Sequence, residues 1–155
     1  MTFKESTLEG YFEHPIIKTD DTLTAISSAM LNAKTSLLKK HGVSFQQYTI
    51  LKTLYLSKGK PASIKSLTLK MFDKMSNTSR LVAKLEKKGL IKRKVSDSDR
   101  RQVEIIISNI GEKVFRTAAK ELSEAILNSY KSLTNVELTE LLKFLAKIKS
   151  CKNDL

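Results

Sequence analysis

Apolar residues recur every three or four positions through the first part of the chain, which is the spacing of one face of an α-helix. From Thr22 this pattern predicts a long helix that closes with basic residues and Gly42. A second helix is expected to begin at Ser44, because Ser44 and Gln47 have the spacing of a capping box. Its apolar face continues at helical spacing, and the helix should stop at Gly59.

Two shorter helices are predicted next. Ser63 can cap the segment SIKSLTLKMF, and a tight connection at residues 73–75 separates it from MSNTSRLVAKLEKKG. The later helix should end at Gly89, since glycine best tolerates the left-handed conformation that follows many helices. A turn of only a few residues between two such helices is typical of a helix-turn-helix.

After Gly89 the pattern changes from helical to alternating, which predicts two strands. Ile91, Arg93 and Val95 should share a face of the first strand, and the second should present Val103, Ile105 and Ile107. The charged segment SDSDRRQ lies between them. A hairpin directly after a helix-turn-helix is a wing.

The rest of the chain is predicted to be helical, with two apolar stripes. They comprise Val114, Phe115, Ala118, Leu122 and Ile126 in one helix and Leu138, Leu141, Leu142, Leu145 and Ile148 in the next. Thr134 and Glu137 form a second capping box. The stripes and the first long helix need an apolar partner. This can be an ordinary monomeric core or, the interpretation we favour, a helical dimer interface.

Charge narrows the function. The 155 residues carry a formal charge of +12, and residues 58–101 hold 14 Lys/Arg against 4 Asp/Glu. Such a concentration indicates a polyanionic partner. A membrane surface is disfavoured, because the basic segment has no large apolar face beside its charge.

Other classes of protein are disfavoured by what the sequence lacks. It has neither a run of about 20 apolar residues nor a secretory signal, and its single cysteine, Cys151, cannot form an intrachain disulfide. A cytoplasmic location is expected. No Cys/His cluster, phosphate loop or catalytic constellation is evident, so we expect no metal, cofactor or enzymatic activity.

The helix over residues 75–88 offers side chains suited to a DNA major groove. Arg80 can bond guanine O6 and N7, Asn77 can pair with adenine N6 and N7, and Ser76 and Ser79 can reach bases or phosphates. The lysines toward its end are interpreted as contacts to the DNA backbone: Lys84, Lys87 and Lys88. For each of these lysines, and for Arg80, the alternative is a solvated surface charge.

In the wing, Arg100 and Arg101 stand at the tip, where one guanidinium could enter a narrow minor groove. Asp99 should repel DNA, so its presence suggests that it orients an arginine. The alternative is a loop whose charges simply cancel.

Residues 44–111 resemble the winged helix-turn-helix core of the MarR family of bacterial transcriptional regulators. The resemblance is carried by SNTSRLVAKLEKKGLIKRKVSDSDRRQVEIII and by Gly111. Two departures concern local turns. Met71, Phe72 and Asp73 stand where a glycine is common, and Ser108-Asn109-Ile110 replaces the usual Leu-Thr start of the next helix.

The resemblance implies a mainly α fold with a small β-hairpin wing, in which a winged helix-turn-helix core joins a helical dimerisation domain. Residues 1–43 would form an N-terminal arm and the first dimerisation helix, residues 44–110 the DNA-binding region, and residues 111–155 the C-terminal dimerisation helices. It implies major-groove contacts at Ser76, Asn77, Ser79 and Arg80, and a minor-groove contact at Arg101 braced by Asp99, with Arg100 as the fallback.

The function implied is a homodimeric regulator of a palindromic double-stranded DNA operator. It would be a repressor that a small aromatic or phenolic effector releases. Two other functions remain open from the residues alone. One is an architectural DNA-binding protein without an effector, and the other is a winged-helix module whose basic face binds an acidic protein.

Overall fold

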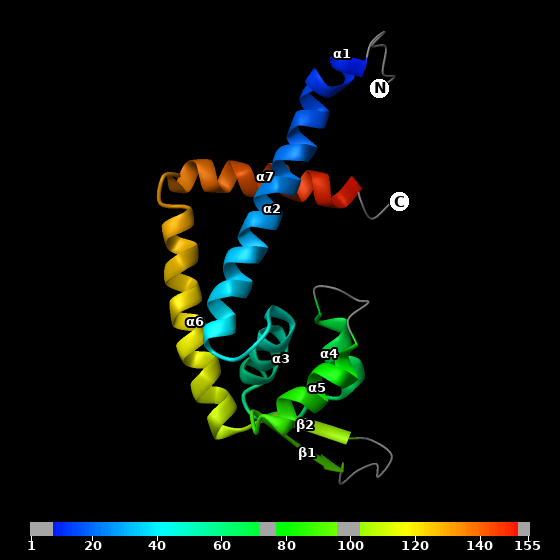
Figure 1. The fold of residues 1–155 in the computed structure, drawn as a ribbon, viewed down its shortest axis with the longest axis vertical. Coiled ribbons are helices and arrows are strands. Elements are labelled where there is room, and N and C mark those ends of the chain that lie inside the picture. Colours follow the sequence, from blue (N-terminus) through cyan, green and yellow to red (C-terminus); the bar gives the residue numbers. More distant parts are fainter. Residues whose placement is uncertain (1–7, 72–76, 96–102, 152–155) are drawn as a thin grey trace. The chain divides into compact units, whose positions relative to one another are not determined.

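The computed structural model describes residues 8–71, 77–95 and 103–151, which form helices and one antiparallel hairpin (Figure 1). This confirms the mainly helical fold class with a β-hairpin. Two compact units divide the chain, Met1–Ala118 and Ala119–Leu155. The elements in chain order are α1 Leu8–Glu13, α2 Pro15–Lys40, α3 Phe45–Leu56, α4 Ile64–Leu69, α5 Thr78–Lys87, β1 Ile91–Val95, β2 Val103–Ile107, α6 Asn109–Ser129 and α7 Asn135–Cys151.

Helix α2 begins at Pro15, seven residues before the predicted start at Thr22. Proline suits the first turn of a helix, because its fixed φ is already helical and its missing N–H would have no partner there. His14 caps the same end, since its Nδ1 accepts a hydrogen bond of 3.2 Å from the Ile16 N–H. The start at Thr22 was wrong because the charged residues after Pro15 obscure the apolar period. The basic C-terminal turn and Gly42, with φ +70°, follow the prediction.

The predicted caps of the next two helices are confirmed. Ser44 Oγ accepts from the Gln47 N–H at 3.2 Å, and Gln47 Oε1 accepts from the Ser44 N–H at 3.1 Å. Ser63 caps α4 by accepting from the Ser66 N–H at 3.1 Å. Each such cap satisfies backbone donors that the helix itself leaves unpaired.

The core of the first unit lies where α3 packs against α5 and β2. Helix α5 buries Thr78, Val82 and Leu85, and α3 contributes Leu51 and Leu54 to the same core. Burying each of these aliphatic side chains stabilises the fold by about 1.5–3 kcal/mol. The orientation of α5 is therefore set by its buried face.

The hairpin has the predicted register. Ile91 pairs with Ile107, Arg93 with Ile105 and Val95 with Val103, so the residues predicted to share a face lie opposite one another. Ala62 extends the hairpin: its N–H and carbonyl each exchange a 2.9 Å hydrogen bond with Ile105. Sequence periodicity could not reveal this bridge, because a single paired residue has no period.

Ser108 joins the hairpin to α6. Its hydroxyl donates to the Gly89 carbonyl at 2.6 Å and accepts from the Gly111 N–H at 2.9 Å, while its own N–H donates to the Leu90 carbonyl at 3.1 Å. The serine that departs from the family pattern is thus a helix cap that also ties α6 to the end of α5. The departure leaves the turn intact.

An aromatic cluster attaches the start of α6 to α3. The ring of Phe115 lies 5.4 Å from that of Tyr48 and 4.7 Å from that of Tyr55, measured between ring centroids. The Arg116 guanidinium lies 5.1 Å from the Tyr55 ring centroid, at cation–π distance. Burial raises the pKa of Tyr48 above its ordinary value.

Within the second unit, the capping box of α7 is confirmed. Glu137 Oε2 accepts from the Thr134 N–H at 2.7 Å and from its hydroxyl at 2.8 Å, and these bonds lower the pKa of Glu137. The predicted stripe of α7 is only half-covered, since Leu142 is 68% exposed and Ile148 is 38% exposed. An apolar face of this kind indicates an interaction surface.

Replacing Gly111 by alanine should destabilise the protein by about 3 kcal/mol or more, since the new Cβ would lie 1.9 Å from the Leu90 carbonyl oxygen. Gly89→Ala is the matched control. Gly89 has φ +68° and open space around it, so alanine there should cost only about 1–2 kcal/mol of backbone strain. Urea unfolding of both variants measures the difference. Equal losses would contradict the close approach of α6 to Leu90.

Candidate nucleic-acid interface

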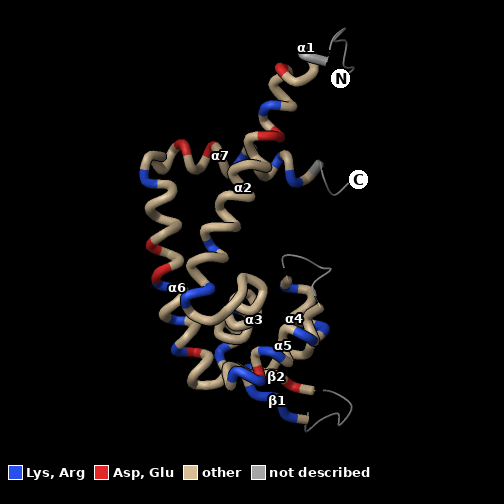
Figure 2. Tube along the Cα trace, in the orientation of Figure 1, with Lys and Arg blue, Asp and Glu red and all other residues tan. Residues whose placement is uncertain are grey.

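One face of α5 is exposed and basic, and the other is buried. Ser79, Arg80, Lys84 and Lys87 are exposed, whereas Thr78, Val82 and Leu85 are buried, as the helical period predicts. Figure 2 shows Lys and Arg gathered on α4, α5 and β1. Short polar and basic side chains on one helix face are suited to a DNA major groove, because they leave the base edges accessible.

Asn77 lies immediately before α5 as its N-cap. Its Oδ1 accepts a hydrogen bond of 3.0 Å from the Arg80 N–H. Pairing with both N6 and N7 of adenine would need this oxygen as an acceptor and the amide nitrogen as a donor. The capping bond therefore competes with adenine N6 for Asn77 Oδ1, whereas the amide N–H groups of Asn77 stay available to donate to adenine N7.

The three predicted backbone-contact lysines differ in their surroundings. The side chains of Lys84 and Lys87 have no hydrogen-bond or ion-pair partner among the described residues. The Lys88 ammonium instead donates to the Gly42 carbonyl at 2.6 Å and to Gln47 Oε1 at 3.3 Å. Sequence reasoning missed these contacts, because the partners lie more than 40 positions away along the chain.

In the described parts of the chain, two ion pairs involve residues of the hairpin. Arg93 Nε lies 2.9 Å from Glu86 Oε2, which links β1 to α5, and Lys94 Nζ lies 3.4 Å from Glu104 Oε2 across the strand pair. The Arg93 contact is an ion pair and not a hydrogen bond, since the Nε–H has no aligned acceptor among the described residues. These cations are partly neutralised, so they orient the hairpin more than they add to its positive field.

Several predicted site residues lie outside the described residues. They are Ser76 before α5 and the wing-tip residues Asp99, Arg100 and Arg101. The strands on either side of the wing tip are described and paired, with Val95 opposite Val103.

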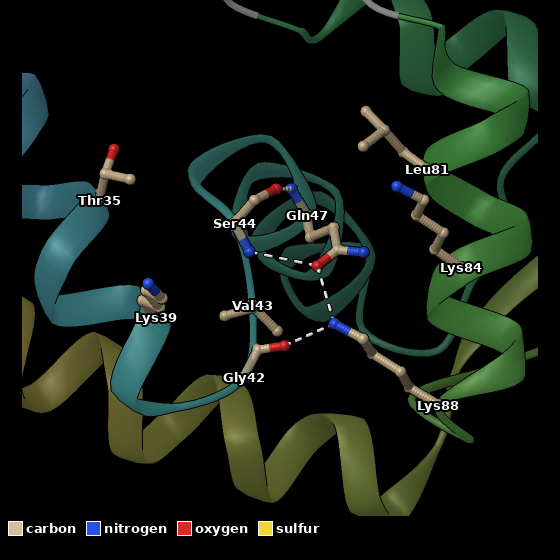
Figure 3. A pocket seen from close by; sticks show the side chains of 9 residues that line it. All are labelled: Thr35, Lys39, Gly42, Val43, Ser44, Gln47, Leu81, Lys84 and Lys88. Atoms are coloured by element: carbon tan, nitrogen blue, oxygen red, sulfur yellow. Dashed lines mark hydrogen bonds between the residues drawn. The ribbon is translucent and has the colours of Figure 1, made fainter.

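A cleft of about 440 Å³ lies beside the C-terminal half of α5 (Figure 3). It is lined by Thr35, Lys39, Gly42, Val43, Ser44, Gln47, Leu81, Lys84 and Lys88. Three lysines and the N-terminus of α3 make its lining positive, and none of the nine residues is acidic. A volume in this range is typical of small-molecule sites.

In residues 8–71, 77–95 and 103–151, no group of three or more His, Cys, Asp or Glu side chains could hold a metal ion. Among the helices of that same part of the chain, none is long and apolar enough to cross a bilayer.

A helix-turn-helix whose second helix exposes a basic face, followed directly by an antiparallel hairpin, defines a winged-helix DNA-binding protein. The family model for the transcriptional regulator SarA/Rot matches residues 32–118, more than half of the chain. The chain therefore belongs to the MarR/SarA-Rot family of winged-helix transcriptional regulators. This confirms the resemblance to the MarR family, and members of this family are DNA-binding regulators and not enzymes.

Individual relatives agree with this assignment. The transcriptional repressor MprA of Escherichia coli K12 is 23% identical over 125 residues, which cover 81% of this chain and 71% of MprA. The crystal structure of the regulator BldR from Sulfolobus solfataricus is 30% identical, covers 86% of this chain and 94% of its own, and has a TM-score of 0.70. The crystal structure of the organohalide-sensing regulator RdhR-CbdbA1625 in its 2,4-dichlorophenol-bound form is 21% identical and has a TM-score of 0.79. The match covers 97% of this chain and 88% of that one.

Proposed function

We propose that the protein is a homodimeric transcriptional repressor that binds a palindromic operator and is released by a small effector. The observation that carries this proposal is the division of α5 into a buried face, with Val82 and Leu85, and an exposed face with Ser79 and basic residues. Burial fixes the helix on the core, so the exposed face is presented rigidly for base recognition.

The major-groove contacts in this proposal come from Ser76, Asn77, Ser79 and Arg80. Arg80 is the strongest of these candidates, because its side chain is exposed on the presented face and a guanidinium can bond both guanine acceptors. Lys84 and Lys87 would contact phosphates. Lys88 differs, because its ammonium already has two acceptors within the protein.

The wing would supply the minor-groove contact. In this proposal Arg101 enters the groove, Asp99 orients its guanidinium, and Arg100 serves if Arg101 does not reach. Two points support this contact: β1 and β2 are paired as far as Val95 and Val103, the last described residues on either side of Arg101, and arginine suits a narrow minor groove.

Dimerisation would use residues 1–43 and 111–155, and residues 44–110 would bind DNA. Exposed apolar side chains on the helices outside the DNA-binding region support this division. They include Tyr11, Phe12, Ile16 and Ile26 in α1 and α2, and Val136, Leu142, Phe144 and Ile148 in α7. A stable dimer buries such surface, and its two-fold symmetry requires an inverted repeat in the DNA.

Selection of bound duplexes from a random library, followed by footprinting, tests the function as a whole. We expect discrete protected sites that contain an inverted repeat with half-sites about one helical turn apart, roughly 34 Å. Sedimentation should show a dimer at micromolar concentration. Smeared protection would favour an architectural protein. Absence of DNA binding at every salt concentration would favour a module that binds an acidic protein.

Arg80→Ala should weaken binding to the selected duplex by roughly 1–3 kcal/mol and relax preference at one base position. Lys120→Ala is a suitable control, because Lys120 is an exposed lysine of α6, outside the helix-turn-helix and the hairpin. Fluorescence anisotropy on selected and scrambled duplexes at one salt concentration measures both effects. Equal weakening on the two duplexes would show that Arg80 contacts only the DNA backbone.

The effector would occupy the cleft beside α5. Its size and lysines suit a small aromatic molecule that carries an anionic oxygen, and the related RdhR-CbdbA1625 has been crystallised with 2,4-dichlorophenol. A ligand there would touch Leu81 and Lys84 of the recognition helix directly. Binding that favours another orientation of α5 would lower DNA affinity.

Titrating the protein–duplex complex with 2,4-dichlorophenol should release the DNA. Thr35→Trp should abolish the release, because an indole at this lining position would fill the cleft. Ser36→Trp, an adjacent exposed position outside the lining, is the control. Equal release from both variants would place the effector elsewhere, and no release from the wild type would argue against this class of effector.

A further inference from the structure

The Lys88 side chain connects three elements of the first unit. Lys88 is the C-cap residue of α5, and its ammonium reaches the Gly42 carbonyl at 2.6 Å and Gln47 Oε1 at 3.3 Å. Gly42 follows the end of α2, and Gln47 lies in the first turn of α3. Figure 3 shows the side chain running from α5 toward both acceptors, with dashed lines marking the bonds.

Gln47 is a fixed anchor for this contact. Gln47 as a whole residue is only 4% exposed, and the same Oε1 accepts from the Ser44 N–H at 3.1 Å as part of the α3 capping box. Because the bond from Ser44 holds Gln47 Oε1 in place, the Lys88 ammonium has an acceptor at one defined position. A charged donor also strengthens each bond relative to a neutral one.

The neighbouring lysines have no such contacts. The side chains of Lys84 and Lys87 lack polar partners among the described residues, although they belong to the same two turns of α5. A phosphate could bind either without breaking a bond in the protein. The Lys88 ammonium already uses two of its three N–H donors within the protein, so only one donor remains for a phosphate, and Gly42 and Gln47 set its position.

We propose that Lys88 is a positioning residue for DNA recognition and not a phosphate contact. Its ammonium fixes the C-terminal end of α5 against the junction of α2 and α3, and so sets the angle at which Ser79 and Arg80 are presented. Because α5 is about 15 Å long, a small tilt at Lys88 displaces the other end of the helix. This role rests on the proposed DNA-binding function.

The salt dependence of DNA binding separates the two roles. Lys88→Met removes the ammonium while keeping most of the aliphatic stem, and Lys87→Met is the matched control one position away. For Lys88→Met we expect Kd on the selected duplex to rise about fivefold to tenfold, with little change on a scrambled duplex and an unchanged log–log salt slope. Lys87→Met should lower the slope by about one unit on both duplexes.

A slope lowered equally by Lys88→Met and Lys87→Met would overturn the proposal and make Lys88 a phosphate contact. A double-mutant cycle with Gln47→Met adds a second criterion. If Lys88 acts through Gln47, the double variant should lose less operator affinity than the sum of the losses in the two single variants. Strict additivity would mean that the contact with Gln47 has no part in recognition.

A measurement without DNA keeps this proposal separate from the proposed function. Amide hydrogen exchange in the wild type and both methionine variants should show faster exchange at Lys88, Gly89 and Leu90 in Lys88→Met only, by about threefold or more. If the wild type binds no DNA, the proposed function fails, while this exchange still reports whether Lys88 holds the helix end. Unchanged exchange at these amides would overturn the positioning role.

Discussion

Burial of one face of α5 is the interaction on which the rest of the DNA-binding region depends. Val82 and Leu85 are completely buried among residues of α3 and the hairpin, so α5 cannot rotate about its axis without exposing them. The opposite face, with Ser79 and Arg80, is therefore directed away from the core. The hairpin is positioned by the same packing, because Leu90 and Ile91 follow α5 after only two residues and are themselves buried.

Polar contacts at the two ends of α5 complete its placement. Asn77 caps the first turn. At the other end, Lys88 donates to the Gly42 carbonyl between α2 and α3, and the Gly89 carbonyl accepts from the Ser108 hydroxyl. These bonds divide the many cations of this region into two groups. Some, such as Lys88 and Arg93, have partners within the protein, and others, such as Lys84 and Lys87, have none among the described side chains. Net charge alone does not distinguish the two groups.

The local elements were predictable where a short sequence pattern has one structural solution. The capping boxes at Ser44 and Thr134, the left-handed residues Gly42 and Gly89, and the alternating strands all follow from neighbours within a few positions. The prediction failed at the start of α2, where charged residues interrupt the apolar period but do not oppose a helix. The roles of Ser76, Asp99, Arg100 and Arg101 stay predictions, because these residues lie outside the described parts of the chain.

Periodicity, caps and motifs depend on residues close together along the chain, so they were enough to predict the order of helices and strands from α2 onward, the buried face of α5 and the family of the protein. Helix α1 was not predicted. The partners of the polar groups became known only from the folded chain. It pairs Ala62 with Ile105, joins Ser108 to Gly89, and brings Lys88 to Gly42 and Gln47. Sequence could not supply these partners, because a lysine exposed to water and a lysine bonded to a carbonyl look the same in the sequence. Packing of distant segments alone determines which acceptor lies within reach.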